Sequence, residues 1–154
     1  MPDDELIRPF IDANVLFSAT HKPENVFVRI WAMTGVVPTT SLHAITEVRN
    51  NIGEAAQRRR LESLLRWSVI VGDRPDDLIP PNTVLRAKDR PILSAAIGAD
   101  CNYLLTSDKH DFAHLYKRTI KGVYIMYTMD FCYAFQYRLD LDMLAYNFSE
   151  ATGW

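Results

Sequence analysis

Four acidic residues of this sequence lie within or next to predicted regular elements. Asp12 directly follows a short apolar run, and Asp108 lies just past a second one. Glu47 lies within a segment of helical spacing, and Asp89 opens another. Carboxylates gathered at one place repel each other and are costly to desolvate unless a cation lies among them. Because Mg²⁺ and Mn²⁺ prefer oxygen ligands and can activate water beside a phosphodiester, the set predicts metal-assisted phosphoryl chemistry.

Each of these acids also has a purely structural interpretation. Asp12 is a common type of turn residue at the end of a strand. Glu47 lies outside the apolar stripe of its helix, so it can belong to a solvated face. Asp89 precedes a helix and can cap it, and Asp108, like nearby Asp111, can be a loop acid or a cap. The functional prediction therefore depends on the fold bringing the acids together.

Apolar runs alternate with segments of helical spacing along the chain. The predicted strands are residues 9–11, 36–40, 68–71, 103–106 and 123–127. The predicted helices are residues 24–33, 41–51, 54–67, 89–99 and 129–138, with a short helix after the loop at 107–112. This alternation predicts an α/β fold with a parallel sheet and helices on both faces. Binding sites in such sheets lie beyond the carboxyl ends of the strands, so Asp12 and Asp108 are expected at the same edge.

The composition indicates one ordinary globular domain. Of the 154 residues, 48% are hydrophobic and 23% are charged, which suits a full hydrophobic core. No apolar run reaches membrane-spanning length and the start lacks a secretion signal, so a cytoplasmic protein without membrane contact is expected. Cys101 and Cys132 lie in apolar surroundings and are predicted to be reduced thiols. The net charge of −2 does not exclude a nucleic-acid enzyme, since a local basic patch can lie beside an acidic metal site.

A basic run within the third predicted helix has two interpretations. It consists of Arg58, Arg59 and Arg60. The run can contact phosphates of RNA, because arginine side chains release counterions when they neutralise a nucleic-acid backbone. It can equally form a solvated helix face, where Glu54 and Glu62 pair with the arginines at helical spacing.

Four segments carry a resemblance to a known family. They read FIDANVLFSA, TSLHAITEVRNNI, KDRPILSAAIGADCNYLLTSDKHDF and GVYIM, in this order. Each segment is short, but the ordered set is fairly specific and spans residues 8–135. On these segments the sequence resembles the PIN-domain family of nucleases. Among its subgroups it is most similar to the bacterial and archaeal members of the VapC-like toxin type, which belong to toxin–antitoxin modules.

The resemblance implies a fold and a set of site residues. The implied fold is a three-layer α/β/α sandwich with a parallel five-stranded sheet in residues 1–138, followed by a C-terminal extension at 139–154 that could serve a dimer or a partner. The family's metal-binding acids fall on Asp12, Asp89 and Asp108, and its helix glutamate, a ligand or the base that orients water, falls on Glu47. The polar residues that surround these acids in the family match Asn14, Thr106 and Asp111.

The activity implied by the resemblance is cleavage of RNA that depends on Mg²⁺ or Mn²⁺. A small antitoxin protein would cover the acidic cleft, and a homodimer is left open. The main alternative is a catalytically inactive PIN-fold module that binds RNA or protein, and dependence on Mg²⁺ would separate the two. A small-molecule phosphohydrolase is less favoured, because the usual Asp-x-Asp pair is absent when position 14 is Asn.

Overall fold

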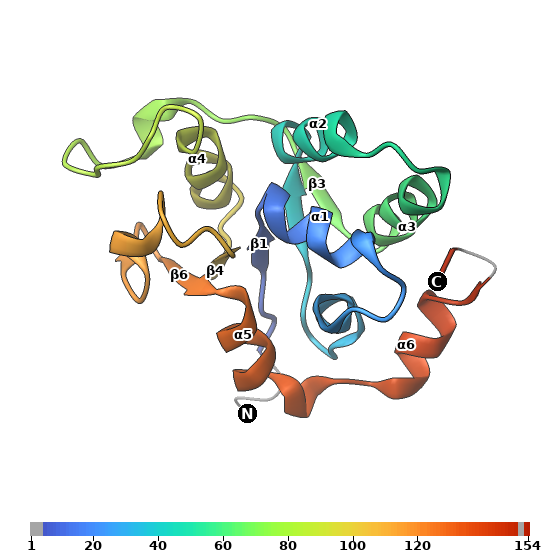
Figure 1. Cartoon of the computed structure of the whole chain (residues 1–154). Coiled ribbons are helices and arrows are strands. Elements are labelled where there is room, and N and C mark those ends of the chain that lie inside the picture. Colours follow the sequence, from blue (N-terminus) through green and yellow to red (C-terminus); the bar gives the residue numbers. More distant parts are fainter. Residues whose placement is uncertain (1–4, 151–152) are drawn as a thin grey trace.

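A six-stranded sheet forms the centre of the computed structural model, which describes residues 5–150 and 153–154. Its strands are β1 (Pro9–Ile11), β2 (Thr39–Ser41), β3 (Val69–Val71), β4 (Tyr103–Thr106), β5 (Thr119–Ile120) and β6 (Val123–Tyr127). They lie in the order β3-β2-β1-β4-β6-β5 (Figure 1). Neighbouring strands are parallel except β5 and β6, which are antiparallel.

Helices connect the strands and cover both faces of the sheet. The α-helices are α1 (Ala13–His21), α2 (Leu42–Asn51), α3 (Ala55–Arg66), α4 (Arg90–Gly98), α5 (Thr128–Ala134) and α6 (Leu141–Asn147). The 3₁₀ helices are η2 (Val26–Ala32), η3 (Asp76–Leu78), η4 (Ala113–Leu115) and η5 (Gln136–Arg138). Helix α4 contacts β2 and β4 on one face, whereas α1, η2 and α5 lie on the other, with α2 and α3 packed against α1 (Figure 1). This is the predicted three-layer α/β/α arrangement.

The two middle strands are apolar along almost their whole length because helices cover both of their faces. Phe10 of β1 and Leu104 of β4 are completely buried and are partners in the parallel register. Because this register ends both strands at the same level, Asp12 and Thr106 lie side by side at the carboxyl edge of the sheet. The sheet therefore carries polar side chains from two distant segments to one place.

Helix α1 is absent from the sequence prediction. Its residues Val15, Leu16 and Ala19 have helical spacing and are buried against the sheet. The helix begins directly after Asp12, which caps it, so no loop separates it from the first strand. Without Gly or Pro between the strand and the helix, the sequence gives no signal that a separate helix begins here. The helix predicted at residues 24–33 is the shorter 3₁₀ helix η2.

The sheet also has one strand more than the five that were expected, because β5 adds a sixth, antiparallel strand at one edge. The turn between β5 and β6 consists of Lys121 and Gly122, whose φ angles are 51° and 83°. Two successive residues with positive φ form the tight turn that suits a β-hairpin. With two residues, β5 is too short to give an alternating pattern in the sequence.

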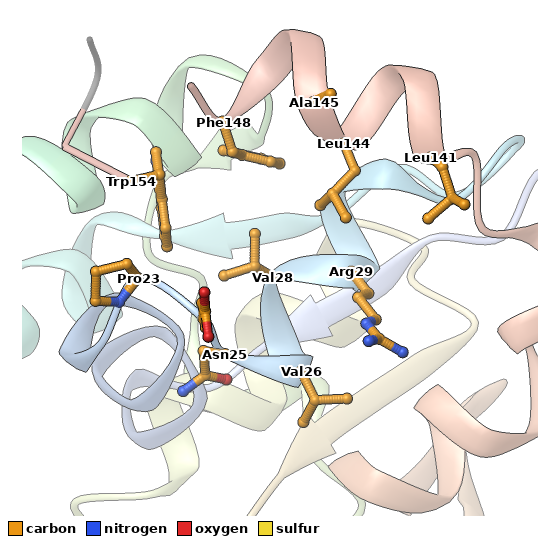
Figure 2. Close-up of a pocket in the computed structure, with 11 residues that line it drawn as sticks. Pro23, Asn25, Val26, Val28, Arg29, Leu141, Leu144, Ala145, Phe148 and Trp154 are labelled. Carbon is orange, nitrogen blue, oxygen red and sulfur yellow. The ribbon is translucent and has the colours of Figure 1, made fainter. Parts of the chain in front are cut away.

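The C-terminal part of the chain departs from the single helix expected at 129–138. Helix α5 ends at Ala134, and η5 follows it before the chain enters α6. Helix α6 packs against η2, and a cavity of about 650 Å³ between them is lined by residues such as Val28, Leu144 and Trp154 (Figure 2). None of the predicted site acids lines this cavity. Among the described residues, no helix is long and apolar enough to span a bilayer.

The three arginines of α3 differ in their surroundings. For Arg60, both predictions, contact with RNA phosphates and a solvated helix face, are wrong. Its side chain is buried, and its guanidinium donates hydrogen bonds to the carbonyl oxygens of Thr20 at 2.7 Å, His21 at 3.0 Å and Gly153 at 3.2 Å. Arg58 and Arg59 are exposed. Since the donors of Arg60 are taken up by backbone, only Arg58 and Arg59 keep the proposed contact with RNA.

We predict that Arg60→Gln lowers the free energy of unfolding by about 3 kcal/mol, because charge-assisted hydrogen bonds to buried carbonyl groups are lost. Arg58→Gln and Arg59→Gln should each change it by less than about 0.5 kcal/mol, as is usual for exposed positions. Urea denaturation of the three variants followed by circular dichroism measures this. Equal stability in all three would contradict the structural assignment of Arg60.

Candidate functional site

Asp12 is a buried carboxylate at the carboxyl end of β1. It caps α1, since its Oδ1 accepts a hydrogen bond from the backbone N–H of Ala13 at 2.7 Å. Its Oδ2 accepts from the hydroxyl of Thr106 at 2.9 Å and from the Asn14 amide at 3.2 Å. Burial nevertheless raises the pKa of Asp12 to about 7, and the charges of Asp89 and Glu47 add to this effect, although the hydrogen bonds oppose it. A nearby cation would stabilise the ionised form of this buried carboxylate.

Asn14 and Thr106 join the ends of β1 and β4 across the sheet. The Asn14 amide donates to the Thr106 hydroxyl at 3.3 Å, and its oxygen accepts from the backbone N–H of Ser107 at 3.1 Å. The Thr106 hydroxyl in turn accepts from the backbone N–H of Asp108 at 3.1 Å. These bonds fix the start of the loop that carries Asp108. Both residues thus hold Asp12 and the loop of Asp108 in place.

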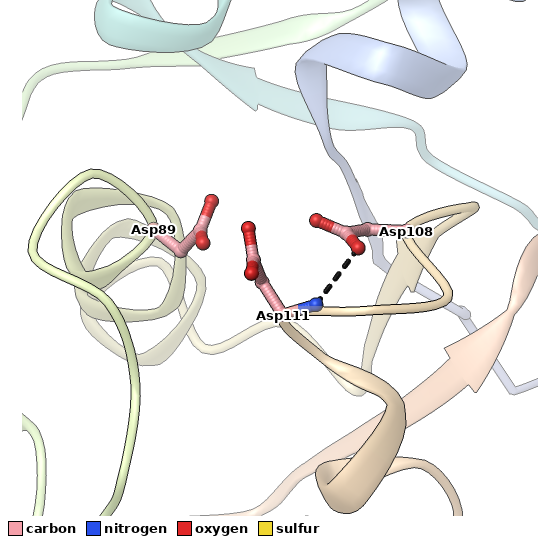
Figure 3. Close-up of side chains that lie close together, drawn as sticks. All are labelled: Asp89, Asp108 and Asp111. Atoms are coloured by element: carbon pink, nitrogen blue, oxygen red, sulfur yellow. Dashed lines mark hydrogen bonds between the residues drawn. The ribbon is translucent and has the colours of Figure 1, made fainter.

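Asp89, Asp108 and Asp111 form an acidic triad beside Asp12. One carboxylate oxygen from each lies within 4.8 Å of the other two; Asp89 directly precedes α4, and the other two side chains come from the loop after β4 (Figure 3). Asp108 Oδ1 accepts hydrogen bonds from the backbone N–H groups of His110 at 2.8 Å and Asp111 at 2.9 Å. The turn made by these bonds directs the second oxygen of Asp108 toward the other carboxylates (Figure 3).

Asp89 is the member of the triad whose environment is least satisfied. Its Oδ2 is buried without a hydrogen-bond partner among the described residues. The pKa of Asp89 is raised to about 6, mainly by burial; the charge of Lys88 opposes this rise, and the carboxylates of Asp111 and Asp108 contribute to it. In the described part of the chain its side chain makes no capping bond to α4, so the helix-cap interpretation is wrong.

Two cations adjoin the triad that the sequence did not single out. Lys88 Nζ lies 3.1 Å from Asp111 Oδ2, and Arg86 lies 3.4 Å from Asp111 Oδ1. The hydrogen bond from Lys88 lowers the pKa of Asp111, and the same bond raises the pKa of Lys88. The sequence signal was the position of Lys88 directly before Asp89, but its partner Asp111 is more than twenty residues away. The carboxylate of Asp111, which was expected to lie around the site, is thus among the three acids that lie close together.

Glu47 lies outside the triad. It is exposed on α2 and borders a cavity together with Asn14 and Asn51, and its link to the acids is electrostatic, through Asp12. The structure therefore brings Asp12, Asp89, Asp108 and Asp111 to one edge, with Glu47 at its rim.

The comparisons with known proteins concern the fold. No protein-family model and no curated protein matches the sequence. The structure is similar to a chain in the crystal structure of VapBC2 from Rickettsia felis bound to a DNA fragment from their promoter. The TM-score is 0.58 at 14% sequence identity, over 79% of this chain and 98% of that chain. This likeness confirms the α/β fold predicted from the sequence.

The acidic edge fits a hard divalent cation. Its ligand atoms are carboxylate oxygens, the type that Mg²⁺ and Mn²⁺ prefer. A buried oxygen of Asp89 lacks a partner among the described residues, and burial raises the pKa of both Asp12 and Asp89. A cation placed among these oxygens would offset the cost of their burial. Without one, the edge is destabilising when its acids are ionised.

This cost predicts how Asp12→Asn changes stability with pH in EDTA. Folded Asp12 keeps its proton up to about pH 7, whereas the unfolded chain releases it near 3.8, so wild-type stability should fall as pH rises between these values. Asn carries no charge at any pH. The melting temperature of the variant relative to wild type should therefore rise between about pH 4 and pH 7.

Circular dichroism melts at several pH values measure this difference. Loss of the Asn14 hydrogen bond would shift all values by a constant and leave the trend unchanged. Asp142→Asn, in an exposed acid of α6, serves as the matched control and should show no such trend. A pH-independent difference for Asp12→Asn would mean that its burial does not destabilise the charged form.

Proposed function

We propose that this protein is an endoribonuclease that depends on Mg²⁺ or Mn²⁺, of the PIN-domain type. The observation that carries the proposal is the triad of Asp89, Asp108 and Asp111, with a buried, unpartnered oxygen on Asp89 in the described structure. If Asp89 had only a structural role, its buried oxygen would be expected to have a hydrogen-bond partner. The resemblance of the sequence to PIN-domain nucleases and the fold similarity support the same assignment.

The acids would divide the work by their positions. Asp89 and Asp108 would bind the metal directly, and Asp111 would join them when Lys88 releases it. Asp12, whose charge acts on Asp89, would be a further ligand at the same edge. When bound, the ion would lower the pKa of water and neutralise the charge that develops on the phosphate. Glu47, at the rim, would accept the proton of the attacking water or orient it. In-line attack would leave a 5′-phosphate and a 3′-hydroxyl.

A toxin role with an antitoxin partner is part of the same proposal. The similar crystal structure is that of a VapBC2 complex, and the sequence resembles toxins of such modules. A small protein that covers the acidic edge would inhibit cleavage by excluding RNA. A second copy of this chain remains a further candidate partner.

We predict that the protein cleaves RNA in Mg²⁺ or Mn²⁺ but not in EDTA. Asp89→Asn should reduce the rate by more than the roughly 10- to 100-fold that is typical for loss of an outer partner of a metal site. Asp142→Asn keeps the same change of charge on an exposed part of α6 and should cleave like wild type. The measurement is the rate of cleavage of a panel of structured RNAs.

An inactive module would behave differently in this experiment. It would bind RNA equally well with and without EDTA and would cleave none of the panel. That outcome, with folded protein by circular dichroism, would replace the nuclease by the binding module.

Metal binding itself can be followed without activity. Excess Mn²⁺ should raise the melting temperature of wild type, because a ligand that binds only the folded state stabilises it. About 3 kcal/mol is expected at a hundredfold excess over the dissociation constant. Asp89→Asn should lose most of this gain, whereas Asp142→Asn should keep it. If wild type gains nothing from Mn²⁺ or Mg²⁺, the acids do not form a metal site.

A further inference from the structure

A second cavity opens next to the acidic edge, between α1 and α2. Its volume is about 480 Å³, and it is lined by residues of both helices, among them Asn14, Phe17, Ser18 and Asn51. We propose that this cavity is a nucleobase pocket, in which Phe17, Ser18 and Asn51 determine which base lies beside the cut phosphate. The proposal rests on the proposed ribonuclease function and names a specificity determinant for it.

The position of the cavity ties it to the chemistry. Asn14, which lines it, donates hydrogen bonds to Asp12 and Thr106, and Glu47 at its border acts electrostatically on Asp12. A nucleotide with its phosphate at the acids can therefore reach this cavity with its base. The cavity between η2 and α6 has no residue of the acidic edge in its wall.

The cavity wall offers the two kinds of contact that a base requires. Phe17 is half-buried and borders the cavity, while its ring stacks on His21 with a centroid distance of 5.8 Å and an interplanar angle of 25°. An aromatic side chain held in this way can support a stacked base. Ala13 and Val48 make the remainder of the floor apolar.

Polar atoms without partners in the described structure face the same cavity. The Ser18 hydroxyl has no hydrogen-bond partner among the described residues. The Asn51 amide nitrogen donates to the Glu47 carbonyl at 2.8 Å, which leaves its Oδ1 as a free acceptor in the described part of the chain. An acceptor in this position favours bases with an exocyclic amino group over uracil. An apolar side chain of a protein partner would leave these atoms unsatisfied.

The test compares three variants with wild type as full-length chains. Phe17→Leu keeps an apolar side chain but removes the aromatic face, whereas Ser18→Ala and Asn51→Ala each remove one polar group. Tyr133→Leu is the matched control, because this exposed aromatic residue on α5 does not line the cavity. Melting temperatures show that each variant is folded.

The probes are fluorescently labelled short oligoribonucleotides of adenine, cytosine or uracil, with anisotropy measured in Ca²⁺. We expect wild type to bind the adenine and cytosine probes more tightly than the uracil probe. Phe17→Leu should weaken all three by roughly tenfold, as for loss of one stacked base. Asn51→Ala should reduce the difference in binding affinity between the adenine or cytosine probe and the uracil probe, and Ser18→Ala should reduce it to a lesser degree. Cut positions in a mixed-sequence RNA with Mn²⁺ should shift in the same variants and stay unchanged in Tyr133→Leu.

The outcomes separate this inference from the proposed function. Base-dependent binding that Phe17→Leu reduces, without cleavage by wild type, would support the pocket and reject the nuclease. Cleavage by wild type, with affinities and cut positions unchanged in all three variants, would support the nuclease and overturn the pocket. Equal weakening in Tyr133→Leu and Phe17→Leu would also overturn it, because the effect would then not come from the cavity.

Discussion

The carboxylate of Asp12 is the constraint on which the rest of this structure depends. It caps α1, accepts the hydroxyl of Thr106 from β4, and lies in the core where its charge is costly. The first and fourth strands must therefore end at the same level, and α1 must start without an intervening loop. The carboxyl edge is thus built around a buried carboxylate that depends on hydrogen bonds from its neighbours, and the triad lies at the same edge.

Much of the fold follows from patterns that the sequence contains. The middle strands are short apolar runs, and helices such as α2 begin at a residue that caps them, as Ser41 does through the backbone N–H of Ala44 at 3.2 Å. Parallel topology then places Asp12 and Asp108 at one edge. Among the elements that the sequence did not predict, α1 was missed because it follows β1 without a break, and β5 because it has only two residues.

The candidate site was predictable in its location but not in its details. Sequence order indicates which strand ends carry acids, but not that Asp111 points at Asp89 while Glu47 stays at the rim. The direction of the Asp111 side chain depends on the loop that the hydrogen bonds of Asp108 hold in place. Arg60 illustrates the same limit, because three adjacent arginines look alike until the backbone carbonyls that one of them binds are known.

The ion pairs of Asp111 bear on the net charge of this edge and on how a cation would bind there. Lys88 and Arg86 already supply positive charge to the carboxylate that a metal would need. Binding of a metal ion would then be an exchange of one counterion for another, in which the ammonium group of Lys88 would leave Asp111 as the ion arrived. The net charge of the edge would change less on metal binding than its four carboxylates suggest, because the protein carries its own replaceable counterion.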